Sequence, residues 1–182
     1  MMRCLQTERL LLQPLSLADA EQTQRLFPHW EIVRFLANRF PWPYPPDGAL
    51  TYYRDDALPA MERGDEWHWT LRLKSDPAHH IGSVCLCRGD TNRGFWLGLP
   101  WHRQGLMSEA VNAATEFWFT TLGFPEMRVA KAIANTASRR ISENNGMRVV
   151  ATEEREYIGG RFPSEIWVIT AEEWHRRRVT PK

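Results

Sequence analysis

A strand, a long helix and a second strand follow one another in the middle of the chain, and this order constrains the fold most. Residues Phe95 to Leu99 predict a strand, Gly105 to Leu122 an amphipathic helix, and Arg128 to Ala134 another strand. No hairpin can join two strands that a helix of this length separates. We therefore expect the helix to be a crossover that joins two parallel strands.

The segments on either side of this unit predict antiparallel hairpins. Trp67 to Lys74 alternates apolar and polar residues, and short turns separate it from expected strands over Ile81 to Arg88 and Phe95 to Leu99. The other expected elements are a strand over 8–15, helices over 19–27, 30–38, 48–63 (bent at Pro59) and 136–144, and strands over 148–157 and 162–170. The helix over 19–27 is expected to start at the Ser16 and Asp19 pair.

Together these patterns predict an α+β fold, with a mostly antiparallel sheet of about six to seven strands flanked by helices. We expect one domain over residues 1–182, with a core over 7–170 and a short C-terminal helix or tail over 171–182. Hydrophobic residues make up 43% of the 182 residues and charged residues 25%, as in ordinary globular proteins. Lys and Arg total 23 against 22 Asp and Glu, a balance that weighs against nucleic-acid binding.

Targeting and redox features favour the cytoplasm. No apolar run has the length of a membrane span, and Met1 to Leu12 lacks the apolar stretch of a secretory signal. The 3 cysteines are an odd number, which does not suggest a disulfide framework. We interpret Cys85 and Cys87 as small hydrophobes on one face of a strand, because no second cluster of metal-ligating residues accompanies them.

The stretch from Leu99 to Ala110 predicts an anion-binding site. A strand ends, a polar loop containing Gly105 follows, and a helix begins. Unpaired backbone N–H groups and the positive end of the helix dipole favour an anion at such a junction. The stretch is neither the dinucleotide-binding glycine pattern nor a P-loop, because no Gly-Lys-Ser/Thr follows. Taken alone, Gly105 is better explained as a packing glycine.

At these residues the chain resembles the GNAT superfamily, in the branch of the ribosomal-protein N-terminal (RimJ/RimL-type) acetyltransferases. That family carries a [QR]-x-x-G-x-[GA] loop followed by [TS]-E-A, which wraps the pyrophosphate of acetyl-CoA. His102, Gly105 and Met107 stand at the three defining positions, and the first and last depart from the pattern. The resemblance implies that acetyl-CoA is the acyl donor, that the sheet is splayed at its site, and that the loop and first helical turn bind it. The implied residues are His102, Arg103, Gln104, Gly105, Leu106, Met107 and Ser108.

A second stretch, Asn135 to Met147, is similar to that branch's N-x-x-S-x-x-(apolar)-x-E-x-x-G-[FM] segment. The resemblance implies that Asn135 bonds near the pantetheine arm and that Ser138 supports the leaving thiolate. Ser142 stands where many family members have a tyrosine acid. Ser138 is also explained as a helix-start residue and Ser142 as a structural one, while Arg139 is expected to reach either CoA phosphates or solvent.

The implied mechanism is direct attack of a neutral amine on the thioester, without a covalent enzyme intermediate. Backbone groups near Leu97 and Leu99 would pair with the pantetheine amides, as in the family. No carboxylate occurs on the strands that carry the family's usual base, so His68 is the first candidate for the general base and Glu31 the second. A route through water is the alternative, and it favours an α-amine or another weakly basic amine.

The leading interpretation is an N-acetyltransferase that acts on a protein N-terminus, an amino acid, a polyamine or a drug amine. The competing interpretation is a catalytically silent acyl-CoA-binding or sensor domain, because the loop departs from the family pattern. An RNA-binding or RNA-modifying protein is disfavoured by the charge balance. We expect a monomer or homodimer, no metal, and no nucleic-acid or membrane partner. The aromatics from Phe40 to Tyr44 fit either a substrate wall or a rigid surface loop.

Overall fold

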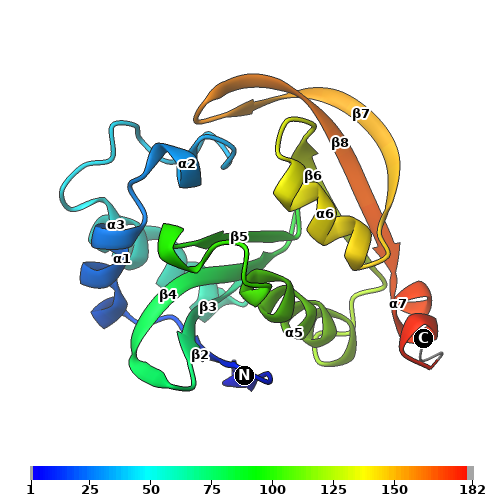
Figure 1. Ribbon diagram of the computed structural model, residues 1–182, viewed down its shortest axis with the longest axis horizontal. Helices are drawn as coiled ribbons and strands as arrows, with labels where there is room; N and C mark the ends of the chain where they lie inside the picture. Colours follow the sequence, from blue (N-terminus) through cyan, green and yellow to red (C-terminus); the bar gives the residue numbers. More distant parts are fainter. Residues whose placement is uncertain (1, 180–182) are drawn as a thin grey trace.

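The computed structural model describes residues 2–179, which form two sheets with helices packed around them (Figure 1). The larger sheet has the strand order β1-β2-β3-β4-β5, and every neighbouring pair in it is antiparallel. Its strands are β1 Leu5–Gln6, β2 Leu10–Pro14, β3 Glu66–Leu73, β4 Asp76–Cys87 and β5 Arg93–Leu97.

The second sheet has the order β6-β8-β7 and is also antiparallel. Its strands are β6 Glu126–Ala132, β7 Arg148–Tyr157 and β8 Gly160–Thr170. The long, curved β7–β8 hairpin arches towards α2 (Figure 1). At its tip, the Ile158 and Gly159 amides donate to the Leu36 and Arg34 carbonyls at 3.0 and 2.9 Å. The hairpin therefore fixes residues 34–37 although they lie far away in the sequence.

The two sheets meet at one end and part at the other, between β5 and β6. The Asn92 amide donates to the Arg128 carbonyl, and the Arg128 amide donates to Asn92 Oδ1, both at 2.7 Å. Further along, Lys131 Nζ lies 4.5 Å from the ring centre of Phe95, with the same offset of 36 residues as the Asn92–Arg128 pair. The strands thus run parallel, as the crossover predicts, yet they belong to separate sheets.

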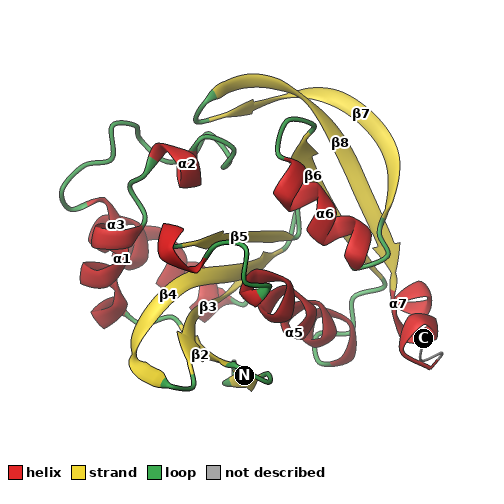
Figure 2. Cartoon of the chain, in the orientation of Figure 1, coloured by secondary structure: helices red, strands yellow, loops and turns green. Residues whose placement is uncertain are grey.

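The helices of the chain include α5 Leu106–Thr120 and α6 Thr136–Asn144, which lie side by side (Figure 2). Asn145 Nδ2, just after α6, donates a hydrogen bond to Asn112 Oδ1 on α5 at 2.6 Å. The others are α1 Ala20–Leu26, α2 Trp30–Val33, α3 Gly48–Tyr52, α4 Leu58–Arg63 and α7 Ala171–Val179, with 3₁₀ turns η1 Leu17–Asp19 and η3 Leu99–Trp101 and a π-helical turn η2 Tyr53–Ala57. The expected helix start is confirmed, because Asp19 accepts from the Ser16 amide at 2.8 Å.

Two expected helices need correction. The helix expected over 30–38 ends at Val33, because the following residues pair with the hairpin tip instead. The helix expected over 48–63 is continuous and passes Pro59 by widening into η2 just before it. A wider turn accommodates a proline, which has no N–H to donate to the preceding turn.

Strand boundaries differ by a few residues, chiefly because β4 begins at Asp76 rather than Ile81 and the first expected strand is divided into β1 and β2. The predicted α+β class is confirmed, with eight strands instead of six to seven. The main core lies between the larger sheet and α5, where Trp69 packs on Phe117 and Trp67 on Trp118. Within residues 2–179, no helix is long and apolar enough to cross a membrane.

Candidate functional site

The loop between β5 and α5, residues 98–105, is called the α5 loop below. Arg103 has φ 61° and Gly105 has φ 75°, so the chain reverses twice in the left-handed region just before the helix. The amides of residues 103–108 have no hydrogen-bond acceptor among the described residues. Six free donors next to the positive end of a helix dipole form a site for an anion.

Arg9, at the start of β2, adds a side-chain charge to this loop. Its guanidinium donates to the Gln104 carbonyl at 3.0 Å and to Glu109 Oε2 at 2.9 Å. Glu109 also accepts hydrogen bonds from the Arg9 amide and from the Thr7 hydroxyl. Burial raises the pKa of Glu109, but these bonds and the Arg9 charge together outweigh burial and lower it. Glu109 therefore holds Arg9 at the loop. The sequence analysis did not identify Arg9, because it lies about a hundred residues before the helix.

The other residues expected in the α5 loop are placed as follows. His102 Nε2 bonds to the Leu97 carbonyl at 2.7 Å, so the imidazole braces the loop from within. Because this hydrogen bond occupies the Leu97 carbonyl, that carbonyl is less available for the expected pairing with a pantetheine amide. Leu99 is 37% exposed, whereas Leu106 and Met107 are buried in the core beneath the first helical turn.

At the start of α6, Asn135 acts as the helix cap, because its Oδ1 accepts from the Ser138 amide at 3.3 Å. The expected cap role thus falls on Asn135 rather than on Ser138, whose side chain is buried. Ser142 is fully buried and its hydroxyl has no partner in the described part of the chain. Arg139 donates twice to Glu165, at 2.7 and 3.0 Å, so its guanidinium is already engaged.

Two buried cations lie near the point where β5 and β6 part. Arg93 donates to Thr115 and Asn145, both at 2.7 Å, and burial lowers its pKa to about 9. Lys131 is 8% exposed and, within residues 2–179, contacts the Phe95 ring without a hydrogen bond or carboxylate partner. Burial, then the charge of Arg93, lowers the Lys131 pKa to about 7. This end of the site is therefore electropositive.

A cavity of about 230 Å³ lies on the face of the larger sheet that points away from α5, and it is called the aromatic cavity. Its lining comes from α1, the loop after α2, α3 and the outward faces of β3, β4 and β5. The lining residues are Thr23, Phe27, Leu36, Ala37, Arg39, Phe40, Tyr44, Tyr52, Tyr53, His68, Ser83, Cys85, Cys87, Thr91, Arg93, Gly94, Phe95 and Trp96. Because Gly94 and Trp96 belong to β5, the cavity and the α5 loop share this strand as a wall.

His68, the first candidate for the general base, lines the aromatic cavity. It is 4% exposed, and its Nε2 lies 2.5 Å from Glu66 Oε2. The bond to His68, more than the opposing effect of burial, lowers the Glu66 pKa. The second ring nitrogen of His68 has no hydrogen-bond partner among the described residues. A carboxylate that orients an imidazole is the arrangement of a general base.

Several polar groups near the cavity stay neutral. Burial raises the pKa of Cys85, and it raises that of Cys87 to about 12, so both thiols are protonated at neutral pH. Burial lowers the pKa of His80 to about 4, and this ring bonds to Thr23, which also bonds to Tyr53. The reading of the two cysteines as partly buried apolar groups fits this placement.

Glu31 is exposed on α2 and does not line the aromatic cavity, so the structure does not bring the second candidate base to the site. Trp30 and Trp42 are 43% and 39% exposed and pack on each other outside the cavity. Of the expected aromatic wall, Phe40 and Tyr44 line the cavity.

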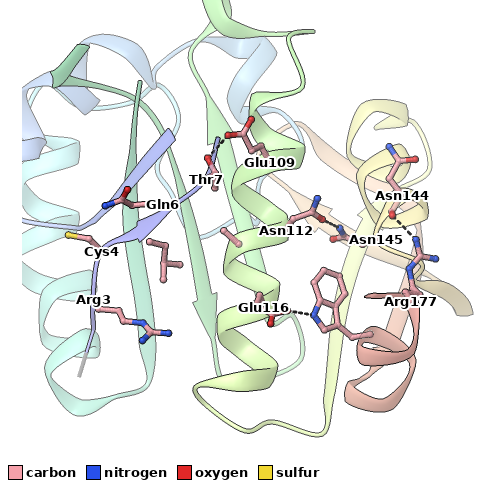
Figure 3. A pocket seen from close by; sticks show the side chains of 13 residues that line it. Arg3, Cys4, Gln6, Thr7, Glu109, Asn112, Glu116, Asn144, Asn145 and Arg177 are labelled. Atoms are coloured by element: carbon pink, nitrogen blue, oxygen red, sulfur yellow. Dashed lines mark hydrogen bonds between the residues drawn. The ribbon is translucent and has the colours of Figure 1, made fainter. Parts of the chain in front are cut away.

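A larger depression of about 780 Å³ lies over the outer face of α5 and is called the α5 groove (Figure 3). Arg3, Gln6 and other residues of the N-terminal strand border one side, and Asn144, Asn145 and Arg177 border the other. Its floor carries the carboxylates Glu109 and Glu116, and none of its lining residues belongs to the α5 loop. Because the groove shares no residue with the α5 loop, the α5 loop and the aromatic cavity remain the candidate site.

The Acetyltransferase (GNAT) domain family matches residues 9–148, a span that contains the α5 loop, His68 and Asn135. The chain belongs to the GNAT acetyltransferase family. Among curated protein sequences, none matches the chain. The protein is therefore an acetyltransferase, and acetyl-CoA is its acyl donor.

Solved GNAT structures share the fold at low sequence identity. The ribosomal-protein-S5-alanine acetyltransferase from Vibrio fischeri has a TM-score of 0.80 and 14% identity over 95% of this chain and 99% of its own. RimL, a ribosomal L7/L12 alpha-N-protein acetyltransferase in complex with coenzyme A, has a TM-score of 0.79 and 12% identity, over 92% of this chain and 98% of its own. The microcin C7 self-immunity acetyltransferase MccE, in complex with acetyl-CoA and AMP, has a TM-score of 0.73 and 15% identity, over 90% of this chain and 93% of its own.

The residues of this GNAT protein fit the donor. Free amides at residues 103–108 and the guanidinium of Arg9 suit a diphosphate, and the departures at His102 and Met107 leave these amides in place. Beyond the Asn92–Arg128 contact, the facing edges of β5 and β6 carry no ladder between them, so their backbone groups are available to a narrow ligand.

Proposed function

We propose that this GNAT protein transfers the acetyl group of acetyl-CoA to a primary amine by direct attack of the amine on the thioester. The observation that carries the proposal is the buried His68, bonded to the half-buried Glu66, in a cavity that shares β5 with the α5 loop. Donor and acceptor can approach β5 from opposite faces, which brings an amine close to the acyl carbon without crossing the helix layer.

On the donor side, acetyl-CoA supplies an activated carbonyl. The amides of residues 103–108 and Arg9 are expected to bind its diphosphate, and Asn135 to lie beside the pantetheine arm. Arg93 and Lys131 add positive charge near the parting of β5 and β6. Positive charge at this point favours the thiolate that leaves. Ser138, which is 6% exposed in the first turn of α6, is the candidate to donate a hydrogen bond to the sulfur.

On the acceptor side, His68 is expected to accept the proton that the amine loses. Glu66 would hold the ring by its Nε2 and stabilise the imidazolium, which leaves the other ring nitrogen for the substrate. Arg39, 3.5 Å from Glu66, keeps this carboxylate ionised. Ser142 and Glu31 have no part in this scheme, and Arg139 supports the start of α6 through Glu165.

Turnover of acetyl-CoA with a panel of primary amines tests the proposal, with release of free thiol and the mass of the product as readouts. The wild-type protein should acetylate at least one amine, and His68→Gln should retain acetyl-CoA binding by calorimetry with strongly reduced turnover. Binding without turnover of any amine by the wild type would instead identify the silent acyl-CoA-binding domain. The cytoplasmic location, the single domain and the monomeric or dimeric state stay predictions.

A further inference from the structure

The wall of the aromatic cavity is a connected set of rings rather than scattered aromatics. Phe27 makes edge contacts with Phe40, Tyr44 and Trp96, with ring centres 5.7, 5.1 and 5.3 Å apart. Phe40 in turn contacts Tyr52 at 4.9 Å. Rings packed edge to face hold one another in place, so the cavity has a fixed shape before a ligand arrives.

The size of the cavity restricts what enters it. Its volume of about 230 Å³ is below the range of about 300–1,000 Å³ that drug-sized ligands occupy. Leu36 and Ala37 form part of its wall, and the hairpin tip holds that segment through the Ile158 amide and the Ala37–Tyr157 bridge. A wall tied in this way does not open easily for a bulky group.

The charges of the cavity restrict the ligand further. None of its described lining residues is an aspartate or glutamate, whereas Arg39 contributes a guanidinium. Arg93 also lines the cavity, but its guanidinium is bonded to Thr115 and Asn145 in the helix layer. The nearest carboxylate, Glu66, is already bonded to His68 and paired with Arg39. A second ammonium on the acceptor would thus be desolvated beside the Arg39 guanidinium, with no free carboxylate among the described lining residues, which is unfavourable.

The same surroundings suit a single amine. Apolar walls and nearby cations favour the neutral form of an amine, and only the neutral form attacks a thioester. His68 is the candidate in the lining to accept the proton that the amine loses, because its second ring nitrogen is unbonded among the described residues. The neighbouring thiols and tyrosine hydroxyls are protonated and have raised pKa values.

We propose that the acceptor is a small monoamine bearing one aromatic or branched apolar group, which fills the space between Phe27, Phe40 and Trp96 while its nitrogen faces His68. This inference rests on the proposed amine acetylation and narrows it. It excludes polyamines and aminoglycosides, which carry several ammonium groups, and it disfavours extended peptides, which exceed the cavity.

The test compares kcat/KM for acetyl transfer to phenethylamine, isoamylamine, spermidine, kanamycin and a hexapeptide with a free N-terminus. We expect phenethylamine and isoamylamine to exceed the other three by at least 30-fold, on the order of the discrimination that apolar pockets achieve. Equal or better turnover of spermidine, kanamycin or the peptide would overturn the inference and leave amine acetylation intact. Absence of turnover with every amine, despite acetyl-CoA binding, would overturn the proposed function itself.

Two variants tie the preference to the cavity. Phe40→Leu should raise KM for phenethylamine about tenfold, on the scale of losing part of an apolar contact, while Trp42→Ala, which removes an exposed ring outside the cavity, should change it less than about twofold. Arg39→Glu should raise spermidine turnover relative to phenethylamine, a gain that misfolding cannot produce. If Arg39→Glu leaves this ratio unchanged, the charge argument is wrong.

Discussion

The α5 loop and the aromatic cavity lie on opposite faces of β5 and differ in what they offer a ligand. The α5 loop offers backbone amides, oriented by positive φ angles at Arg103 and Gly105. The aromatic cavity offers side chains from helices and strands that lie far apart in the sequence. A site made of backbone tolerates substitutions such as His102 and Met107 at the family's defining positions, whereas a site made of side chains changes its ligand when one ring or charge changes.

The strongest test of this difference replaces the proposed base. His68→Gln keeps a polar side chain on β3 but cannot accept a proton at neutral pH, so kcat should fall by about 100-fold or more, as expected for loss of a general base. Acetyl-CoA affinity, measured by calorimetry, should stay within about twofold. A loss of kcat below about threefold would remove His68 from the mechanism and favour a route through water.

Lys131, at the boundary between the two sides, predicts a pH-dependent stability. Its folded pKa of about 7 lies below the unfolded value of 10.5. Between these values the unfolded chain binds a proton that the folded chain lacks, so stability rises with pH by up to about 1.4 kcal/mol per unit. Denaturant unfolding from pH 7 to 9 should show this slope, and Lys131→Met should flatten it. Arg93, with a folded pKa of about 9, contributes mainly above this window.

On the backbone side, Gly105→Val should weaken acetyl-CoA binding about tenfold, because a left-handed φ of 75° costs a branched residue about 1–2 kcal/mol. The atom nearest to a Cβ at Gly105 would be Arg9 Nη2, at 3.5 Å, which is an ordinary contact. The backbone conformation, rather than a clash of this Cβ, is therefore the reason for the weaker binding. The ratio of kcat/KM between different amines should not change. A change in that ratio without weaker donor binding would contradict the division between the two sides.

The smallest expected effect is at the hairpin tip. A Cβ at Gly159 would lie 2.6 Å from the Arg34 carbonyl oxygen, so Gly159→Ala should separate the hairpin from the segment that carries Leu36 and Ala37. We expect kcat/KM for the amine to fall a few-fold, by roughly 1 kcal/mol, with KM for acetyl-CoA unchanged. Steady-state kinetics with each substrate varied in turn distinguishes this result from a general loss of folded protein.

Much of the donor side could be predicted from the sequence because it is local. The strand–helix–strand order, the loop ending at Gly105 and the helix start near Asn135 each depend on residues within a few positions of one another, although the cap itself was expected at Ser138 and lies at Asn135. Arg9 could not be predicted in this way, because Gln104 and Glu109, which it contacts, lie 95 and 100 residues away in the sequence.

The acceptor side was visible in the sequence only through His68 and the aromatics from Phe40 to Tyr44. Glu66 lies just before the expected strand start at Trp67 and was not identified; β3 begins at Glu66, so Glu66 and His68, two residues apart, share one face of the strand and bond. The rings of the aromatic cavity come together through the α1, α3 and hairpin-tip packing, which no periodicity in one segment predicts. The end of α2 at Val33 was mispredicted for the same reason: the competing partner, Ile158, lies in a distant hairpin.

Amide hydrogen exchange with and without acetyl-CoA tests most directly whether backbone donors before α5 bind the donor. The account predicts slower exchange at residues 103–108 and around Asn135, with little change at residues 36–44 of the aromatic cavity. Protection confined to the α5 groove, at residues 3–7 and 112–116, with none at residues 103–108, would contradict it.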